Sequence, residues 1–463
     1  MSSPWGASGC GSIGDPSLMR LAWRGVELRL LLPALLLVPL GFMVTHIALR
    51  GTFEPGPLEL ALGYVGLFVL AHLALVASGH RGDQLILPAV GAMGGIGLIM
   101  LNRLPQDLAG TRAFGLELGM AATQLLWFAV GIVAMLGIAI GLRDHGILRH
   151  YKYSWAAIGI LLLAGTLLFG YEVNGARLWV DLGPVSVQPG EFLKIVLVIF
   201  IAGYLAETRT LLTSARTRIG FLSIPPLPYF LPMLALFGVV MLIIARLNDL
   251  GTALLFFGIF LTMLFVATGR RSYVLIGLLL FVAGAFVAYQ LFGHVQVRVN
   301  VWLDPFADPL GAGFQPVRAI YALGRGGIFG EGLGQGLVTL GGNLTIPFVH
   351  TDFIFTAIAE ELGLLGAFAL LGFAAVLVFR GLRIAALARD DFGGLLAVGL
   401  TASLGLQTLI IIGGNTKLIP LTGITLPFVS YGGSSVLASF IMLGLLLAVS
   451  HRSALGTDEE PKP

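Results

Sequence analysis

Charged residues and cysteines are scarce in this sequence. Asp, Glu, Lys and Arg together make up 11% of its 463 residues, whereas soluble domains contain about 25%. The single cysteine, Cys10, excludes an intrachain disulfide framework and a metal site built from cysteines. The net charge of +3 is not concentrated in a basic tract dense enough to bind nucleic acid. The sequence therefore argues against a disulfide-rich secreted domain, a cysteine-ligated metalloprotein and a nucleic-acid-binding protein.

Long apolar runs fill most of the chain instead. Hydrophobic residues make up 57% of the sequence, and the mean hydropathy is +0.94. One membrane-spanning helix needs about 20 apolar residues, and about a dozen stretches meet that requirement. We therefore expect an all-α polytopic membrane protein with about 12 transmembrane helices. The expected spans lie near 27–48, 57–78, 84–102, 116–142, 153–171, 189–205, 227–246, 249–268, 273–291, 353–379, 393–413 and 424–450.

Basic residues in the short loops predict the orientation of the chain. Arginines precede the first expected span and follow every second one, so they gather on one side of the membrane. Short cytoplasmic loops are rich in Lys and Arg, which predicts a protein of the cytoplasmic membrane with both termini in the cytoplasm. The arginines on that side include Arg20, Arg24, Arg29, Arg81, Arg143, Arg149, Arg209, Arg216, Arg218, Arg270, Arg271, Arg380, Arg383, Arg389 and Arg452.

The segment 292–352 is the longest stretch between expected spans, and the orientation places it outside the cell. Loops of this length are usually functional or disordered. Glycines recur through it, interspersed with apolar residues such as Phe314, Tyr321 and Phe329. We expect short amphipathic helices that lie in the membrane interface.

Three carboxylates, Asp352, Glu360 and Glu361, lie within ten positions of one another at the start of an apolar span. A charged group at the bilayer centre costs at least ~2.5–3.5 kcal/mol, so these residues are expected to have a purpose. Asp352 lies at the water boundary, where it can ionise and reach a substrate. An alternative is that Asp352 only caps the following helix. Glu360 and Glu361 are expected to pair with buried cations or with polar backbone.

A second polar cluster contains Arg177, Glu191 and Lys194. Pro189 suits the first turn of a helix, and Glu191 and Lys194 are three residues apart, so they share a helix face. One interpretation is an ion pair that holds two helices together. The other is that Lys194 and Arg177 present positive charge to an anionic head group. Further along, Asp249 in a tight outer turn is expected to cap the helix that follows it.

The segment Pro420–Ser435 enters the last span through two prolines and a run of small polar residues. Irregular backbone at membrane depth is tolerated only where it lines protein or a wet cavity. We therefore expect a cavity wall that includes Ser430 and Ser434, with Lys417 at its rim.

Five segments together resemble the SEDS family, which includes RodA, FtsW and SpoVE. They are Gly175–Lys194, Asp249–Thr252, Asp308–Gly336, His350–Gly366 and Pro420–Ser435. The resemblance covers roughly residues 84–450 and implies a ten-helix core with a large extracytoplasmic loop over 292–352. The expected organisation is then a cytoplasmic tail (1–26), a two-helix extension (27–83), the core (84–450) and a second cytoplasmic tail (451–463).

The resemblance implies a peptidoglycan glycosyltransferase that polymerises lipid II into glycan strands at the outer face, in cell elongation or division. Asp352 matches the essential acid of the family and would deprotonate the 4-hydroxyl of the acceptor sugar. The residues expected to bind the pyrophosphate or line the cavity are Glu191, Lys194, Arg177, Lys417, Ser430 and Ser434. A class B penicillin-binding protein, a transpeptidase, is the implied partner, together with membrane lipid.

Several points stay open at this stage. A divalent cation, Mg or Mn, can accompany the pyrophosphate, although no metal-ligand cluster is visible in the sequence. A lipid II flippase is the main alternative, but a transporter should carry its critical charges near the membrane midplane. A scaffold without chemistry is a third. Phe348 stands where the family often has Glu, which removes a second carboxylate. Elongation versus division and the purpose of the two extra helices are undecided.

Overall fold

Twelve of the helices described by the computed structural model are long and apolar enough to cross a membrane. The expectation of a polytopic all-α membrane protein is therefore confirmed. Cys10, Arg20, Arg143, Arg216 and the tail 457–463 lie outside the described residues. The described residues are 24–52, 56–106, 112–113, 116–142, 144–173, 175–183, 185–214, 218–219, 222–223, 227–340 and 343–456.

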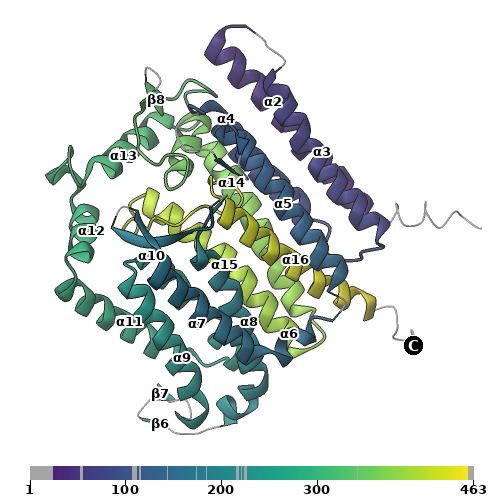
Figure 1. Cartoon of the computed structure of the whole chain (residues 1–463), viewed down its shortest axis with the longest axis vertical. Helices are drawn as coiled ribbons and strands as arrows, with labels where there is room; N and C mark the ends of the chain where they lie inside the picture. The colour runs from purple at the N-terminus through teal and green to yellow at the C-terminus, as the bar shows by residue number, and fades with distance from the viewer. Residues whose placement is uncertain are drawn as a thin grey trace, which may run out of the picture.

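The long helices follow the apolar runs of the sequence, and short elements connect them (Figure 1). The long helices are α2 (Gly25–Arg50), α3 (Gly56–Ala77), α4 (Ile86–Arg103), α5 (Met120–Gly141), α7 (Lys152–Phe169), α8 (Pro189–Ser214), α9 (Leu227–Arg246), α10 (Leu250–Thr268), α11 (Arg271–Leu291), α14 (Ile354–Ala386), α15 (Asp391–Asn415) and α16 (Gly433–Gly456). The short helices are α6 (Gly146–His150), α12 (Gly293–Leu303), the 3-10 turn η1 (Pro305–Ala307) and α13 (Phe314–Gly326).

Short antiparallel strand pairs lie in the connections between the long helices. They are β1 (Arg112–Ala113) with β2 (Leu116–Glu117), β4 (Ala176–Asp181) between β3 (Tyr171–Val173) and β5 (Ser186–Val187), β6 (Arg218–Ile219) with β7 (Leu222–Ser223), and β8 (Thr339–Leu340) with β9 (Asn343–Leu344).

The centre of the bundle contains α4, α8, α15 and α16, which are buried along most of their length, whereas Tyr273 is the buried residue of α11. Small residues allow this close packing, as is common in membranes. A Cβ added at Gly97 of α4 would lie 2.5 Å from the backbone oxygen of Val429. α4 is thus pressed directly against the segment that enters the last span.

The extension formed by α2 and α3 packs against α4 and α5, and buried charges fix it there. The Arg24 guanidinium pairs with Glu27 and donates to the backbone oxygen of His80 at 3.0 Å. The same Glu27 carboxylate contacts His72 on α3 at 2.6 Å. All three side chains are almost completely buried. The extension is therefore held by polar contacts as well as by apolar packing.

α14 is broken at Gly363, where the backbone has a positive φ of 67°. The glycine-rich stretch 327–332 crosses the break and takes over hydrogen bonds that the helix loses. Glu331 N donates to Glu360 O at 3.0 Å, and Leu364 N donates to Gly327 O at 3.0 Å. A Cβ on Gly363 would lie 2.4 Å from Gly330 N, so only glycine permits this contact.

The buried carboxylates Glu360 and Glu361 have cationic and backbone partners at this break. Glu360 accepts from Arg325 at 2.5 Å and from Leu337 N at 2.8 Å. Glu361 pairs with Arg103 and accepts from Gly334 N at 2.8 Å. The expectation that both glutamates pair with cations and polar backbone is confirmed.

Candidate active site

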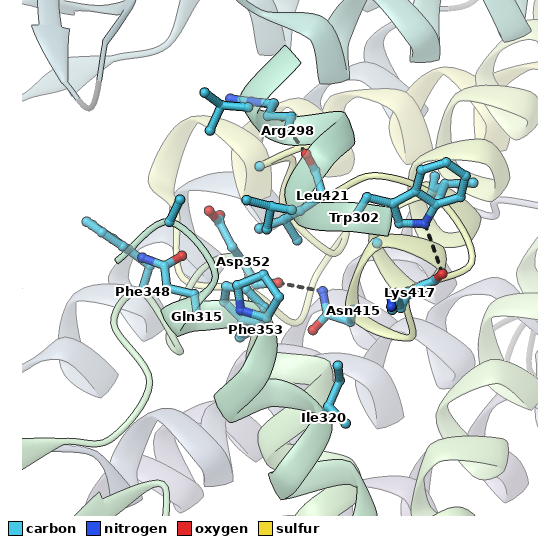
Figure 2. A pocket seen from close by; sticks show the side chains of 17 residues that line it. Arg298, Trp302, Gln315, Ile320, Phe348, Asp352, Phe353, Asn415, Lys417 and Leu421 are labelled. Atoms are coloured by element: carbon cyan, nitrogen blue, oxygen red, sulfur yellow. Dashed lines mark hydrogen bonds between the residues drawn. The ribbon is translucent and has the colours of Figure 1, made fainter. Parts of the chain in front are cut away.

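A cavity of about 400 Å³ opens beside the start of α14, at the end of the bundle that carries α12 and α13 (Figures 1 and 2). Its walls come from α12, α13, the turn before α14, and the α15–α16 connection. Of the site residues predicted from sequence, Asp352 and Lys417 line it. Arg298 and Trp302, both on α12, line it too, and Trp302 lies next to Lys417 (Figure 2).

A tight turn over 348–353 fixes the backbone of Asp352. Phe348 O accepts from the amides of Thr351 at 3.1 Å and Asp352 at 3.0 Å. The helix begins at Ile354, and its N-cap residue is Phe353, without a side-chain capping bond. The interpretation of Asp352 as a helix N-cap is therefore wrong, because Asp352 lies one residue too early.

Asn415, the last residue of α15, holds the same turn from the other side. Its Nδ2 donates to the carbonyl oxygen of Asp352 at 2.8 Å (Figure 2). Its Oδ1 accepts from Thr356 Oγ1 on α14, also at 2.8 Å. Asn415 is buried, and its amide thus ties the end of α15 to the Asp352 turn and to the first turn of α14.

The environment of Asp352 favours its protonated form. Burial raises the pKa of its carboxyl to about 6, while the Thr351 hydroxyl and the Arg298 guanidinium act in the opposite direction. Within the described residues Asp352 takes part in no ion pair. A carboxylate of this pKa is ionised at neutral pH and is a stronger base than an ordinary aspartate, which suits it to deprotonate a hydroxyl group.

Two cations accompany Asp352 in the cavity wall. Arg298 donates to the backbone oxygens of Leu421 at 3.4 Å and Thr422 at 3.3 Å. Lys417 donates from Nζ to Leu303 O at 3.3 Å, and its own carbonyl accepts from Trp302 Nε1 at 3.0 Å. Both head groups are bound by neutral carbonyls, so their positive charges remain to attract an anion.

The cavity wall contains backbone strain. Phe348 and Lys417 have positive φ values of 56° and 62°, a region that costs a non-glycine residue of order 1–3 kcal/mol. Strain of this kind persists only where the surroundings impose it, and it is concentrated at functional sites. At Phe348 it forms the turn that presents Asp352.

Glu191 and Lys194 lie in a buried network outside the cavity lining. Lys194 Nζ donates to Glu191 at 2.5 Å and to Gln407 Oε1 on α15 at 2.8 Å. Gln407 Nε2 in turn donates to Thr425 O at 2.9 Å. The network therefore ties α8 to α15 and to the irregular segment before α16.

Asp249 connects this network to the cavity. It caps α10 as expected, since its carboxylate accepts from Thr252 N at 3.0 Å. Burial raises the pKa of Asp249, the nearby Arg298 opposes that shift, and the Glu191 carboxylate adds to it. Arg298 thus acts electrostatically on both Asp249 and Asp352.

The remaining predicted residues also lie outside the cavity lining. Arg177 is exposed on β4, where its register partner on β3 is Glu172. Ser430 Oγ donates to Thr351 O at 2.6 Å. Ser434 Oγ accepts from Gln188 N at 3.0 Å, just before α8. The two serines therefore hold backbone segments around the site.

Sequence reasoning missed Arg298, Trp302 and Asn415. Arg298 had a signal, because it is a basic residue in a loop predicted to face outward, against the usual distribution of arginines. Trp302 is four residues further on and so shares its helix face. Asn415 was one polar residue in a run between two spans, and only the tertiary structure brings it to Asp352.

The described residues offer a poor set of ligands for a resident metal ion. Those residues contain no group of three or more His, Cys, Asp or Glu side chains able to hold a metal ion. Of the residues that line the cavity, Asp352 supplies the one carboxylate, and it faces two cations. This donor set does not fit a metal held by the protein alone.

Comparison with known proteins gives concordant matches. The family model for FtsW, RodA and SpoVE, described as cell cycle protein, matches residues 83–455. Peptidoglycan glycosyltransferase RodA of Mycobacterium tuberculosis is 42% identical over 393 residues, covering 84% of this chain and 82% of the relative. Stage V sporulation protein E of Bacillus subtilis is 37% identical over 362 residues, covering 77% and 94%. A chain from a structure on polymerization and crosslinking by a peptidoglycan synthase complex is 29% identical, with a TM-score of 0.62, covering 80% of this chain and 98% of that one.

Proposed function

Because the chain belongs to the FtsW, RodA and SpoVE family of cell cycle proteins, we propose that it joins lipid II molecules into glycan strands with Asp352 as the catalytic base. It is a peptidoglycan glycosyltransferase, the activity for which its relatives are named. The single observation that carries the role of Asp352 is its place in a cavity of about 400 Å³ between Arg298 and Lys417.

In the proposed step, the acceptor sugar and the lipid-linked donor meet in this cavity. The Asp352 carboxylate takes the proton of the acceptor 4-hydroxyl while that oxygen attacks the anomeric carbon of the donor. The bond from this carbon to the pyrophosphate oxygen breaks, and the lipid pyrophosphate leaves with the electron pair. Base catalysis of this kind typically contributes 10²–10⁴-fold to the rate.

The pyrophosphate gains negative charge as it leaves, and the site must stabilise that charge. Arg298 and Lys417 are the cations that line the cavity, and we assign this role to them. A divalent cation that arrived with the pyrophosphate would use mainly substrate oxygens, as Mg²⁺ does at other phosphate sites. The proposed step does not depend on such an ion.

The role of the buried Glu191–Lys194 pair is structural: it holds together the helices that support the cavity. Lys194 connects α8 to α15 through Gln407, and both Glu191 and Arg298 act electrostatically on Asp249. Ser430 and Ser434 act with them by holding the turn before α14 and the start of α8. Arg177, exposed on β4, is placed to meet a head group that approaches from the membrane surface.

The proposed orientation puts the cavity at the outer face and both termini in the cytoplasm. The arginine distribution in the short loops supports it. We propose residues 84–450 as the catalytic core and 27–83 as an accessory extension, in keeping with a family match that begins at residue 83. A class B penicillin-binding protein is the proposed partner, since the similar solved chain comes from a peptidoglycan synthase complex.

The test is to incorporate the purified full-length protein into liposomes with its partner transpeptidase and to add labelled lipid II. Glycan strands resolved on a gel are the expected product. Asp352→Asn should abolish them, whereas Asp308→Asn, at an exposed turn of the same loop, should not. Transfer of lipid II across the liposome membrane without strand formation would contradict the enzyme and support the flippase.

A further inference from the structure

A second cavity, of about 550 Å³, lies at the opposite end of α14 from Asp352. The start of α2, the connection from α3 to α4, and the ends of α14 and α16 enclose it. It therefore lies where the two-helix extension meets the core. None of the catalytic residues proposed above lines it.

The lining of this cavity is cationic. Arg81, Arg380 and Arg383 line it, and Asp83 is the acidic residue among its described lining residues. Asp83 is already neutralised, because Arg380 Nε donates to its carboxylate at 2.6 Å. The lining thus has more basic than acidic side chains, and Ser450 and Ser453 add hydroxyl groups on the α16 side.

The other part of the lining is apolar and continues along the membrane-spanning helices. Val26 on α2 is 51% exposed, and Leu387 beyond the end of α14 is 61% exposed. Leu30 lies one turn deeper than Val26 on the same face of α2, and it is 44% exposed. On α14, Val376 is one turn deeper than Arg380 and is 37% exposed.

α4 packs against both α2 and α14, so it connects the two helices that carry these exposed side chains. Both α2 and α14 therefore carry exposed apolar side chains from the cavity into their membrane-spanning parts. Cations at the membrane surface with apolar side chains leading toward the bilayer interior match the two parts of a phospholipid. A soluble anion would use only the cationic part.

We propose that this cavity binds the phosphate head group of an anionic phospholipid, whose acyl chains lie along α2 and α14. Arg81 and Arg383 bind the phosphate, and Ser450 and Ser453 supply hydrogen bonds. In the orientation proposed above, the lipid belongs to the cytoplasmic leaflet, where anionic lipids are attracted by basic residues. The bound lipid joins the two-helix extension to the core.

The test is native mass spectrometry of the delipidated full-length protein in detergent, titrated with phosphatidylglycerol and with phosphatidylcholine of the same chain length. We expect phosphatidylglycerol to bind more tightly. The double variant Arg81→Gln/Arg383→Gln should weaken this binding by about 30-fold, since each basic residue near a membrane surface contributes about fivefold. Arg383→Gln alone should weaken it by about fivefold in a folded protein, because the Arg383 side chain is exposed.

The matched control is Arg271→Gln/Arg389→Gln, which removes two exposed arginines that do not line the cavity. It should bind phosphatidylglycerol like the wild type, and Arg383→Lys should restore binding. Equal affinity for the two lipids, or wild-type affinity in the double variant, would overturn the proposal. Full displacement of the lipid by millimolar glycerol 3-phosphate would show a free-phosphate site and would also overturn it.

Discussion

Asp352 and the pair Glu360–Glu361 are separated by less than ten residues of chain, yet the protein surrounds them in opposite ways. Glu360 and Glu361 are completely buried and receive Arg325, Arg103 and two backbone amides. Asp352 lines an open cavity, and burial raises its pKa to about 6. Buried cations and backbone amides give the two glutamates a structural role, whereas Asp352 faces a cavity that a substrate can enter. The partners of a carboxylate, rather than its position in the sequence, decide what it does.

The largest effect is expected from removing the base. Asp352→Asn keeps the size of the side chain but cannot accept a proton, so polymerisation should fall by about 10²–10⁴-fold. Polymerisation by the Asp352→Ala variant should fall equally, because Asp352 does not cap the helix and its loss removes only the base. Strand formation from labelled lipid II measures both variants, with Asp308→Asn as the control. Wild-type polymerisation by folded Asp352→Asn protein would remove Asp352 from the chemistry.

Neutralising Glu361, a carboxylate paired with a buried arginine, should instead lower the stability of the protein. Glu361→Gln leaves Arg103 buried without its counter-charge, which typically costs about 3–5 kcal/mol. Thermal unfolding in detergent should show a large drop in the midpoint temperature, while Glu331→Gln on the exposed part of the loop should unfold like the wild type. A Glu361→Gln protein of normal stability and no activity would contradict the structural role.

The raised pKa of Asp352 predicts a pH-dependent gain in stability for Asp352→Asn. The pKa is about 6 in the folded protein against an ordinary value of 3.8, so the wild type loses stability as pH rises through this interval. Asp352→Asn avoids that loss and should be more stable by roughly 3 kcal/mol above pH 7. Below about pH 4 the two proteins should unfold alike. Unfolding curves at several pH values test this, and an equal difference at every pH would refute it.

The smallest expected effect is a shift of the pH profile. The Arg298 guanidinium lowers the pKa of Asp352, so Arg298→Gln should raise it. Activity requires the ionised carboxylate, and the acid limb of kcat/KM should therefore move to higher pH. Arg318→Gln, on exposed α13 in the same loop, should leave the limb near pH 6. An unchanged limb in Arg298→Gln would show that the two groups are not coupled.

The sequence predicted the features that local chemistry determines. The twelve spans follow from apolar runs, and the cap at Asp249 follows from an acidic residue at a helix start. It failed where partners come from distant parts of the chain. The break at Gly363 depends on hydrogen bonds from 327–332, and the N-cap interpretation of Asp352 failed because the turn at Phe348 delays the helix by one residue.

The hydrogen bond from Asn415 to Asp352 also has a consequence for the order of synthesis. Arg298, Asp352 and Asn415 come from α12, the turn before α14 and the end of α15. A nascent chain that has emerged only as far as α14 therefore lacks the amide that holds the base, and its Asp352 turn is incomplete. The extension, by contrast, has its buried charge partners within the first 83 residues. The anchoring helices can assemble early in translation, and the reactive carboxylate is positioned only near its end.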